Sequence, residues 1–255
     1  MLARLIGVTV AAQRHTGAFP GTWTPFIIGR PRSWGPDIAL AAAFLILSAF
    51  LAWPSALVEL DVALRDLSDA NRPGWAELIA DKTNRLGQGG LLGGVALGIS
   101  TVLSYRLRTV RPMIAFLVVY GMTGSVLVVK YLLTRLYPHG PGDDSPPYAT
   151  VEQATLFTTL EPAAAYPSGH VLNTIVWYGF LVFLLGARLT VRQRRLLLLA
   201  PPLIVTFSTT YLGYHWLSDA LGGILIGLLI LRIVKRIRWE TVELPTLLEP
   251  EKRYL

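Results

Sequence analysis

The chain has no cysteine among its 255 residues, and only four histidines and few charged residues. Without cysteine there can be no disulfide framework, thiolate nucleophile, iron–sulfur cluster or cysteine-ligated zinc site. The histidines and acids show no metal-ligand spacing, so we expect neither a metal nor a cofactor. Charged residues make up 15% of the chain and hydrophobic residues 53%, which is too apolar for an ordinary water-soluble domain. The composition predicts a protein of the lipid bilayer.

Six apolar stretches are long enough to cross a hydrocarbon core of about 30 Å, which takes roughly 20 helical residues. Because the backbone must satisfy its own hydrogen bonds in lipid, we expect each stretch to be a helix. The sequence therefore predicts an all-α, polytopic membrane protein with six transmembrane helices in a bundle. The expected spans are 37–57, 89–105, 112–133, 170–187, 197–213 and 217–235.

The segment 58–88 between the first two spans has partial helical amphipathicity and is interrupted near Pro73. We expect it to lie along the outer membrane interface as helical pieces with a structural role. The membrane domain is expected at residues 37–236, between a cytoplasmic N-terminal tail at 1–36 and a cytoplasmic C-terminal tail at 237–255.

Lysine and arginine gather on one side of the expected spans. They lie in the N-terminal tail, in the turns after the second and fourth spans, and after the sixth span, whereas most acids lie on the opposite side. Because an even number of spans puts both termini on one side, the positive-inside rule makes that side cytoplasmic. The net charge of +7 is therefore explained by topology and not by a nucleic-acid partner. We expect a multi-pass protein of the plasma membrane with its active site on the outer face.

The candidate functional residues lie at the outer ends of the third, fourth and sixth spans. Charged and polar side chains are expensive at such positions, which makes each of them a candidate for function. Three segments far apart in the sequence would thus bring cations, imidazoles, a hydroxyl and a carboxylate to one membrane depth. The candidates are Lys130, Arg135, Ser168, Gly169, His170, His215 and Asp219.

Local chemistry suggests roles for several of these residues. Ser168 can cap the fourth span and Gly169 lets a ligand approach the backbone, so the helix start is suited to an anion that His170 faces. His215 and Asp219 are four residues apart, on one face of a helix, so the carboxylate can orient the ring. Taken singly, the same features also fit an ordinary helix cap and a structural His–Asp pair. Lys130 can equally extend to the interface and Arg135 can bind lipid headgroups.

Taken together, the motifs resemble those of a known family. Lys130 is followed by Pro138, the segment 167–170 reads PSGH, and Ser208 precedes the His215 and Asp219 pair. This order and spacing is similar to the signature of the type 2 phosphatidic acid phosphatase superfamily, K-x6-R-P, P-S-G-H and S-R-x5-H-x3-D. The resemblance implies a six-helix membrane enzyme that removes phosphate from lipid phosphates or diphosphates without a metal. The family also includes related phosphotransferases and soluble vanadium haloperoxidases.

The resemblance also implies roles at individual positions. His215 would attack phosphorus to form a phosphohistidine, and Asp219 would orient it. His170 would protonate the leaving lipid oxygen and later activate the water that releases phosphate. The implied ligands of the phosphoryl oxygens are Lys130, Ser168 and the Gly169 N–H.

Two positions depart from the family signature. Tyr137 and Thr209 stand where the first and third motifs have arginine, and Arg135 is expected to supply one of the missing guanidinium groups. Loss of charge at a phosphoryl site costs a few kcal/mol of transition-state stabilisation. The expected substrates are polyprenyl or phosphatidate-type lipid phosphates. Two alternatives stay open: a lipid phosphotransferase of the same fold, and a non-catalytic lipid-phosphate transporter or binding protein.

Overall fold

The computed structural model describes residues 23–242, apart from 24, 28, 140–148 and 161–162. The expected tails at 1–36 and 237–255 lie mostly outside this range. The described chain is helical, and its β-structure is limited to one isolated bridge between Arg135 and Ala164. The helices are α2 (Gly35–Leu51), α3 (Ala56–Ala70), α4 (Gly74–Asn84), η1 (Arg85–Gly87), α5 (Gly89–Leu107), α6 (Arg111–Gly124), α7 (Val126–Leu132), α8 (Gly169–Leu185), η2 (Gly186–Arg188), α9 (Val191–Tyr211) and α10 (Leu217–Arg236).

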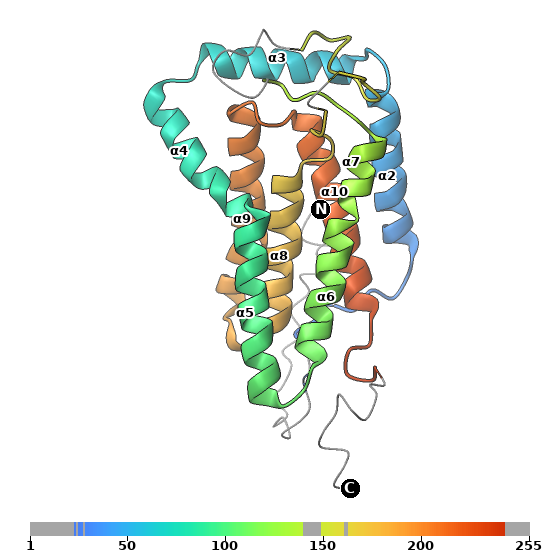
Figure 1. Ribbon diagram of the computed structural model, residues 1–255, viewed down its shortest axis with the longest axis vertical. Helices are drawn as coiled ribbons and strands as arrows, with labels where there is room; N and C mark the ends of the chain where they lie inside the picture. The colour runs from blue at the N-terminus through green and yellow to red at the C-terminus, as the bar shows by residue number, and fades with distance from the viewer. Residues whose placement is uncertain (1–22, 24, 28, 140–148, 161–162, 243–255) are drawn as a thin grey trace, which may run out of the picture.

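The long helices α2, α5, α6, α8, α9 and α10 run along the long axis as a bundle, with α8 near its centre (Figure 1). Four stretches are long and apolar enough to cross a membrane, namely α5, the α6–α7 run, α8 with η2, and α10. The bent pair of α2 and α3, which turns by 78°, raises the number to five if it counts as one span. The all-α membrane fold is confirmed, and the count of six spans is approximate.

The fifth expected span, 197–213, corresponds to α9, which begins earlier than expected. The Gln193 N–H donates to the Thr190 hydroxyl over 3.3 Å, and the Thr190 N–H donates to the side-chain Oε1 of Gln193 over 2.8 Å. This capping box starts the helix at Val191, so the following arginines belong to its first turns rather than to a preceding turn. These charges lower the apolarity of α9 below that of the four clear spans.

The first expected span, 37–57, is wrong at its C-terminal end. The helix α2 stops at Leu51, and α3 starts at Ala56 after Pro54. A proline disfavours helical geometry in the residue before it, which explains the break.

The helices α3 and α4 cover one end of the bundle (Figure 1). They are separated at residues 71–73, as the sequence predicts. The outward face of this pair is apolar, with exposed Leu60, Leu67 and Trp75. The inward face of α3 buries Val58 and, unexpectedly, the charged residues Asp61 and Arg65.

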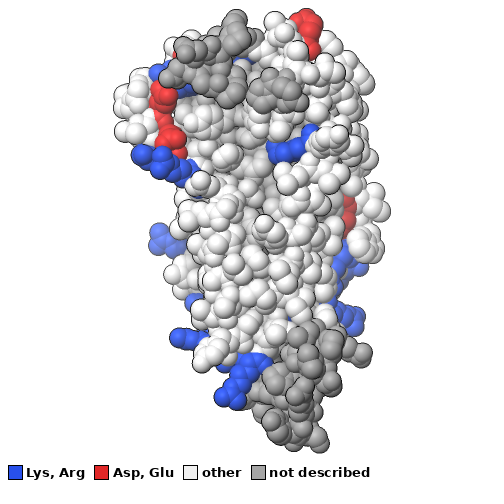
Figure 2. Space-filling view, in the orientation of Figure 1, with Lys and Arg blue, Asp and Glu red and all other residues white. Residues whose placement is uncertain are grey.

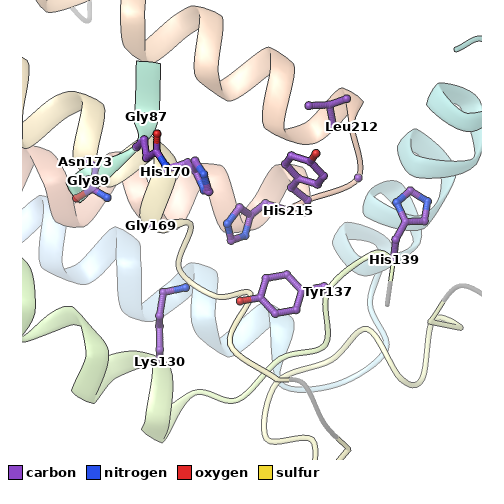
Figure 3. Close-up of a pocket in the computed structure, with 13 residues that line it drawn as sticks. Gly87, Gly89, Lys130, Tyr137, His139, Gly169, His170, Asn173, Leu212 and His215 are labelled. Carbon is purple, nitrogen blue, oxygen red and sulfur yellow. The ribbon is translucent and has the colours of Figure 1, made fainter. Parts of the chain in front are cut away.

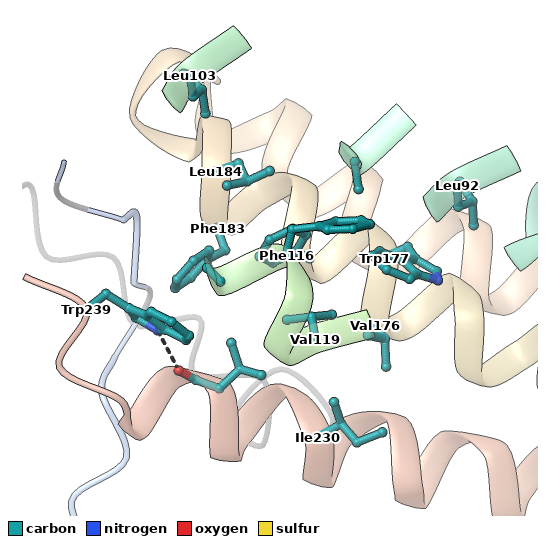
Figure 4. Packing of buried hydrophobic residues seen from close by; sticks show 14 of the residues in the cluster. Leu92, Leu103, Phe116, Val119, Val176, Trp177, Phe183, Leu184, Ile230 and Trp239 are labelled. Carbon is teal, nitrogen blue, oxygen red and sulfur yellow. Dashed lines mark hydrogen bonds between the residues drawn. The ribbon is translucent and has the colours of Figure 1, made fainter. Parts of the chain in front are cut away.

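The main hydrophobic core fixes α8 between α5, α6 and α10 (Figure 4). Trp177 of α8 lies 5.8 Å from Phe116 of α6 between ring centroids. Toward the far end, Phe183 contacts Trp239, whose indole N–H donates to the Val234 carbonyl over 3.0 Å. This packing anchors α8 along its length, so the start of α8 is held in place at the α3 end.

Charge is distributed unevenly along the bundle (Figure 2). In this view the half that α3 and α4 cover carries acidic side chains interleaved with basic ones, whereas the other half shows mainly lysine and arginine. The assignment of the basic end to the cytoplasm stays a prediction.

Candidate active site

A cavity of about 750 Å³ lies at the α3 end, where the end of α7, the start of α8 and the turn before α10 meet (Figure 3). The three segments that carry the expected motifs therefore share one pocket. Its described lining consists of Gly87, Gln88, Gly89, Lys130, Tyr137, His139, Gly169, His170, Asn173, Leu212, Gly213, Tyr214 and His215.

Two imidazoles stand next to each other in this cavity. His170 lies in the first turn of α8, and His215 lies in the turn that precedes α10. Their ring centroids are 5.9 Å apart, and both rings point into the same space (Figure 3). His170 is half-buried and His215 is 5% exposed. A ligand between α7 and these rings would contact both imidazoles.

The start of α8 is built by Ser168. Its hydroxyl accepts from the Val171 N–H, and its own N–H donates to the Asp219 carbonyl over 2.9 Å. Close packing makes this possible, because a Cβ at Gly223 of α10 would lie 2.6 Å from the Ser168 carbonyl oxygen. Ser168 is fully buried and does not line the cavity, whereas Gly169 does. In this structure Ser168 caps the helix and joins it to α10, and Gly169 is the one exposed to a ligand.

Asp219 is close to His215 and firmly held. Its Oδ2 lies 3.6 Å from the His215 Nδ1, an ion-pair distance that is longer than a hydrogen bond. The same Oδ2 accepts from the Trp216 N–H over 2.9 Å. Catalytic hydrogen bonds are often long in the absence of substrate. The geometry thus suits a carboxylate that orients the Nδ1 side of the ring and leaves Nε2 to the cavity.

The protonation state of His215 follows from its burial. Burial lowers the pKa of His215 below the ordinary value of 6.5, and the carboxylate of Asp219 opposes this effect. The ring is therefore neutral at pH 7, as attack on phosphorus requires.

Arg135 occupies a different place from the one expected. Its side chain is fully buried, and its Nη1 donates to Asp219 Oδ1 and to the Ser218 hydroxyl, each over 2.7 Å. Its Nη2 donates to Asp61 Oδ2 over 2.8 Å, and its Nε donates to the Ala154 carbonyl over 2.6 Å. The guanidinium points into the protein and not into the cavity. This geometry makes Arg135 a support for Asp219 rather than the expected ligand of the substrate phosphate.

Asp61 completes this buried group, and the sequence reasoning missed it. Asp61 of α3 also accepts from the Ser218 N–H over 3.0 Å and from the Ser218 hydroxyl. The only sequence signal was a carboxylate four residues before Arg65 on one helical face. The segment expected to be purely structural therefore contributes a carboxylate that holds α10 through Ser218 and Arg135.

Lys130 and Tyr137 line the cavity from the α7 side. The Lys130 ammonium donates to the Ala164 carbonyl, and its Cε would lie 3.9 Å from a Cβ at Gly169. Among the described lining residues, it is the one lysine or arginine. The ring of Tyr137 is 5.7 Å from that of His215, and burial raises the pKa of its phenol, so it stays a neutral donor.

Thr209 takes no place in the cavity wall. It is fully buried, and its carbonyl accepts from the N–H groups of Tyr214 and His215 over 3.0 and 3.3 Å. Thr209 therefore shapes the turn that presents His215.

His139 forms part of the cavity wall. Its Nε2 lies 2.9 Å from Asp69 Oδ2 at the end of α3. Gly213 faces it with a φ of +69°, and a Cβ there would lie 2.0 Å from the His139 Nδ1. Gln88 and Asn173 are further wall residues that no motif indicated.

The described residues hold no group of three or more His, Cys, Asp or Glu side chains suited to a metal ion.

Comparison with known proteins gives consistent matches. A family model described as the PAP2 superfamily matches residues 111–243. The chain is 25% identical over 205 residues to phosphatidylglycerophosphatase B of Bacillus subtilis, covering 78% of this chain and 92% of that protein. The crystal structure of a transmembrane PAP2-type phosphatidylglycerolphosphate phosphatase from Bacillus subtilis is similar in fold, with a TM-score of 0.63 and 24% identity. That likeness covers 78% of this chain and 94% of the other.

Proposed function

The chain belongs to the PAP2 superfamily, and from this membership we propose that it hydrolyses a membrane lipid phosphate or diphosphate through a phosphohistidine intermediate. The observation that carries the proposal is the pair of imidazoles, 5.9 Å apart, that faces Lys130 across one cavity. No metal or cofactor is part of the proposed reaction.

The first step is a transfer of the phosphoryl group to the enzyme. Nε2 of neutral His215 attacks phosphorus, the phosphorus–oxygen bond to the lipid breaks, and His170 as imidazolium donates its proton to the leaving oxygen. In the second step the now neutral His170 takes a proton from water. That water attacks the phosphohistidine, breaks the phosphorus–nitrogen bond and releases inorganic phosphate.

The phosphoryl oxygens are held by charge and by backbone dipoles. Lys130 supplies the positive charge, and the start of α8 at Gly169 supplies N–H groups at a helix N-terminus. Tyr137 donates a neutral hydrogen bond in place of the family's arginine. Phosphoryl transfer requires mainly this positioning and charge stabilisation.

The proposed setting is the plasma membrane, with both tails in the cytoplasm and the cavity at the outer leaflet. The basic residues at the far end of the bundle support this orientation. The curated relative is named for phosphatidylglycerophosphate, so we add this lipid to the polyprenyl and phosphatidate-type candidates.

The test is phosphate release by the full-length protein in detergent–lipid micelles containing a lipid phosphate. We expect His215→Ala to abolish release while the variant keeps its thermal unfolding transition. Full activity in that variant would exclude the assignment of His215.

A lipid phosphotransferase remains the second candidate, because Tyr137 and Thr209 stand where the family signature has arginine. Its test is the same assay with and without an alcohol acceptor. A labelled lipid product in place of free phosphate would favour the transferase, and binding of lipid phosphate without turnover between pH 5 and 9 would favour a binding protein.

A further inference from the structure

The cavity is much larger than a phosphoryl group. Its volume of about 750 Å³ is in the range of pockets that enclose a whole small molecule. The phosphoryl group occupies only the space between the two imidazoles and Lys130. The remaining space is large enough to hold a further part of the substrate.

The cavity residues follow one another in a definite order. Asn173 lies beyond His170, on the side away from His215, together with Gly87 and Gly89 (Figure 3), and Gln88 stands between these two glycines in the chain. Contacts fix this arrangement, because a Cβ at Gly87 would lie 3.1 Å from the His170 Cβ, and one at Gly89 would lie 2.3 Å from the Asn173 Nδ2. One end of the cavity is therefore formed by residues 87–89 and Asn173.

The leaving group points toward this end. In phosphoryl transfer the attacking and leaving atoms are roughly in line on opposite sides of phosphorus. Attack comes from His215, and the leaving oxygen receives its proton from His170. The alcohol that carries this oxygen thus lies beside Gln88 and Asn173.

The two amides are open to a ligand. Within the described part of the chain, the side chains of Gln88 and Asn173 have no hydrogen-bond partner. Gln88 is exposed, and Asn173 is half-buried on α8, three residues after His170. Each amide offers both a donor and an acceptor, as a hydroxyl group does.

Building on the proposed function, we propose that Gln88 and Asn173 form a subsite for a leaving alcohol that carries a free hydroxyl, as a glycerol headgroup does. A hydrocarbon next to the leaving oxygen, as in a polyprenyl phosphate, would leave both amides unpaired. A second phosphate would meet no lysine or arginine among the described residues that line this end of the cavity. The subsite therefore selects lipids with a polyol between the phosphate and the acyl chains.

The experiment measures kcat/KM of the full-length protein with three substrates in matched micelles. Phosphatidylglycerophosphate has a free hydroxyl on its leaving alcohol, whereas phosphatidate and polyprenyl phosphate do not. The wild type should prefer phosphatidylglycerophosphate. Asn173→Leu should lower the ratio of kcat/KM for phosphatidylglycerophosphate to kcat/KM for phosphatidate about tenfold. Gln88→Leu, at an exposed position that tolerates substitution, should lower the same ratio. Gln153→Leu, an amide-to-leucine change outside the cavity wall, should leave the ratio unchanged.

The outcomes separate the subsite from the reaction. If none of the three lipids released phosphate, the proposed function itself would be contradicted. Release with an equal or greater rate for polyprenyl phosphate or its diphosphate would overturn the subsite. The subsite would also be overturned if Asn173→Leu and Gln88→Leu slowed the hydrolysis of all three substrates equally. That result would leave the proposed hydrolytic function unaffected. If Asn173→Leu fails to fold, the ratio in Gln88→Leu decides.

Discussion

At the residue scale, the reactivity of His215 depends on an imidazole that is buried but not isolated. Burial favours its neutral form, while Asp219 at 3.6 Å favours the imidazolium that develops when the ring accepts a positive charge in the transition state. The same carboxylate is fixed by Arg135 and Trp216. The carboxylate that orients the nucleophile is therefore in place before the substrate binds, which lowers the cost of reorganisation during the reaction.

This environment predicts the pH dependence of the enzyme. The pKa of His215 is lowered below the ordinary value of 6.5. The ring is therefore already neutral and nucleophilic at pH 6.5 and above. We expect the acid limb of kcat/KM to fall below pH 6.5, where His215 becomes protonated and loses its nucleophilic lone pair. The measurement is kcat/KM from pH 4.5 to 9 with the fold monitored in parallel. An acid limb clearly above pH 6.5 would contradict this assignment.

Asp61 provides a second prediction at this scale. Its side chain is 1% exposed and binds the guanidinium of Arg135, so Asp61→Asn removes one of two carboxylates around a buried cation. We expect a loss of about 3 kcal/mol in the free energy of unfolding. We also expect kcat to fall with little change in KM, because Asp61 does not line the cavity.

The matched control for Asp61 is Asp66→Asn. Asp66 lies on the same helix and pairs with Arg65, but its side chain is 59% exposed. The carboxylate that this variant loses is exposed to solvent and its ion pair contributes little, so the variant should keep wild-type kcat and stability. Equal effects of the two substitutions would show that Asp61 has no special connection to the active site.

At the element scale, the close packing of α10 against the start of α8 positions the two histidines. A methyl group at Gly223 would meet the Ser168 carbonyl oxygen at 2.6 Å. We expect Gly223→Ala to destabilise the fold by about 2 kcal/mol through overpacking and to reduce kcat, because it separates His170 from His215. Thermal unfolding and steady-state kinetics measure both effects.

The control for this prediction is Gly98→Ala in α5, where a Cβ would meet no atom within 4 Å. Alanine is favoured over glycine in helices, so this variant should be as stable as the wild type or slightly more stable. A wild-type kcat in Gly223→Ala would show that the contact does not set the distance between the imidazoles.

The sequence predicted what is local and missed what depends on tertiary packing. His170, His215 and Lys130 were predicted as cavity residues because short motifs at the helix ends place them at one depth. The guanidinium of Arg135 was misplaced, since its acceptors on Asp61 and Asp219 are 74 and 84 residues away. Those contacts require α3 to lie over the bundle at 78° to α2. Pro54 marks the break between the two helices, but it does not determine which distant residues α3 then contacts.

At the scale of the whole molecule, the account requires the cavity and the basic end of the bundle to face opposite sides of the membrane. The chain has no cysteine, so single cysteines can be introduced without background labelling. We expect a membrane-impermeant maleimide to label Glu77→Cys on α4 in intact cells, because Glu77 is exposed at the cavity end. Arg192→Cys, exposed at the start of α9, should react only after the membrane is permeabilised. Labelling in the reverse order would overturn the proposed orientation.

The central claim is that His215 carries the phosphoryl group between the lipid and water. The most direct measurement is to mix the full-length protein with a lipid phosphate labelled at the terminal phosphorus, quench within the first turnover under alkaline conditions, and locate the label by mass spectrometry. We expect an acid-labile phosphohistidine at position 215 that is absent from His215→Asn. Label on another residue, or single-turnover hydrolysis at the wild-type rate in His215→Asn, would contradict it.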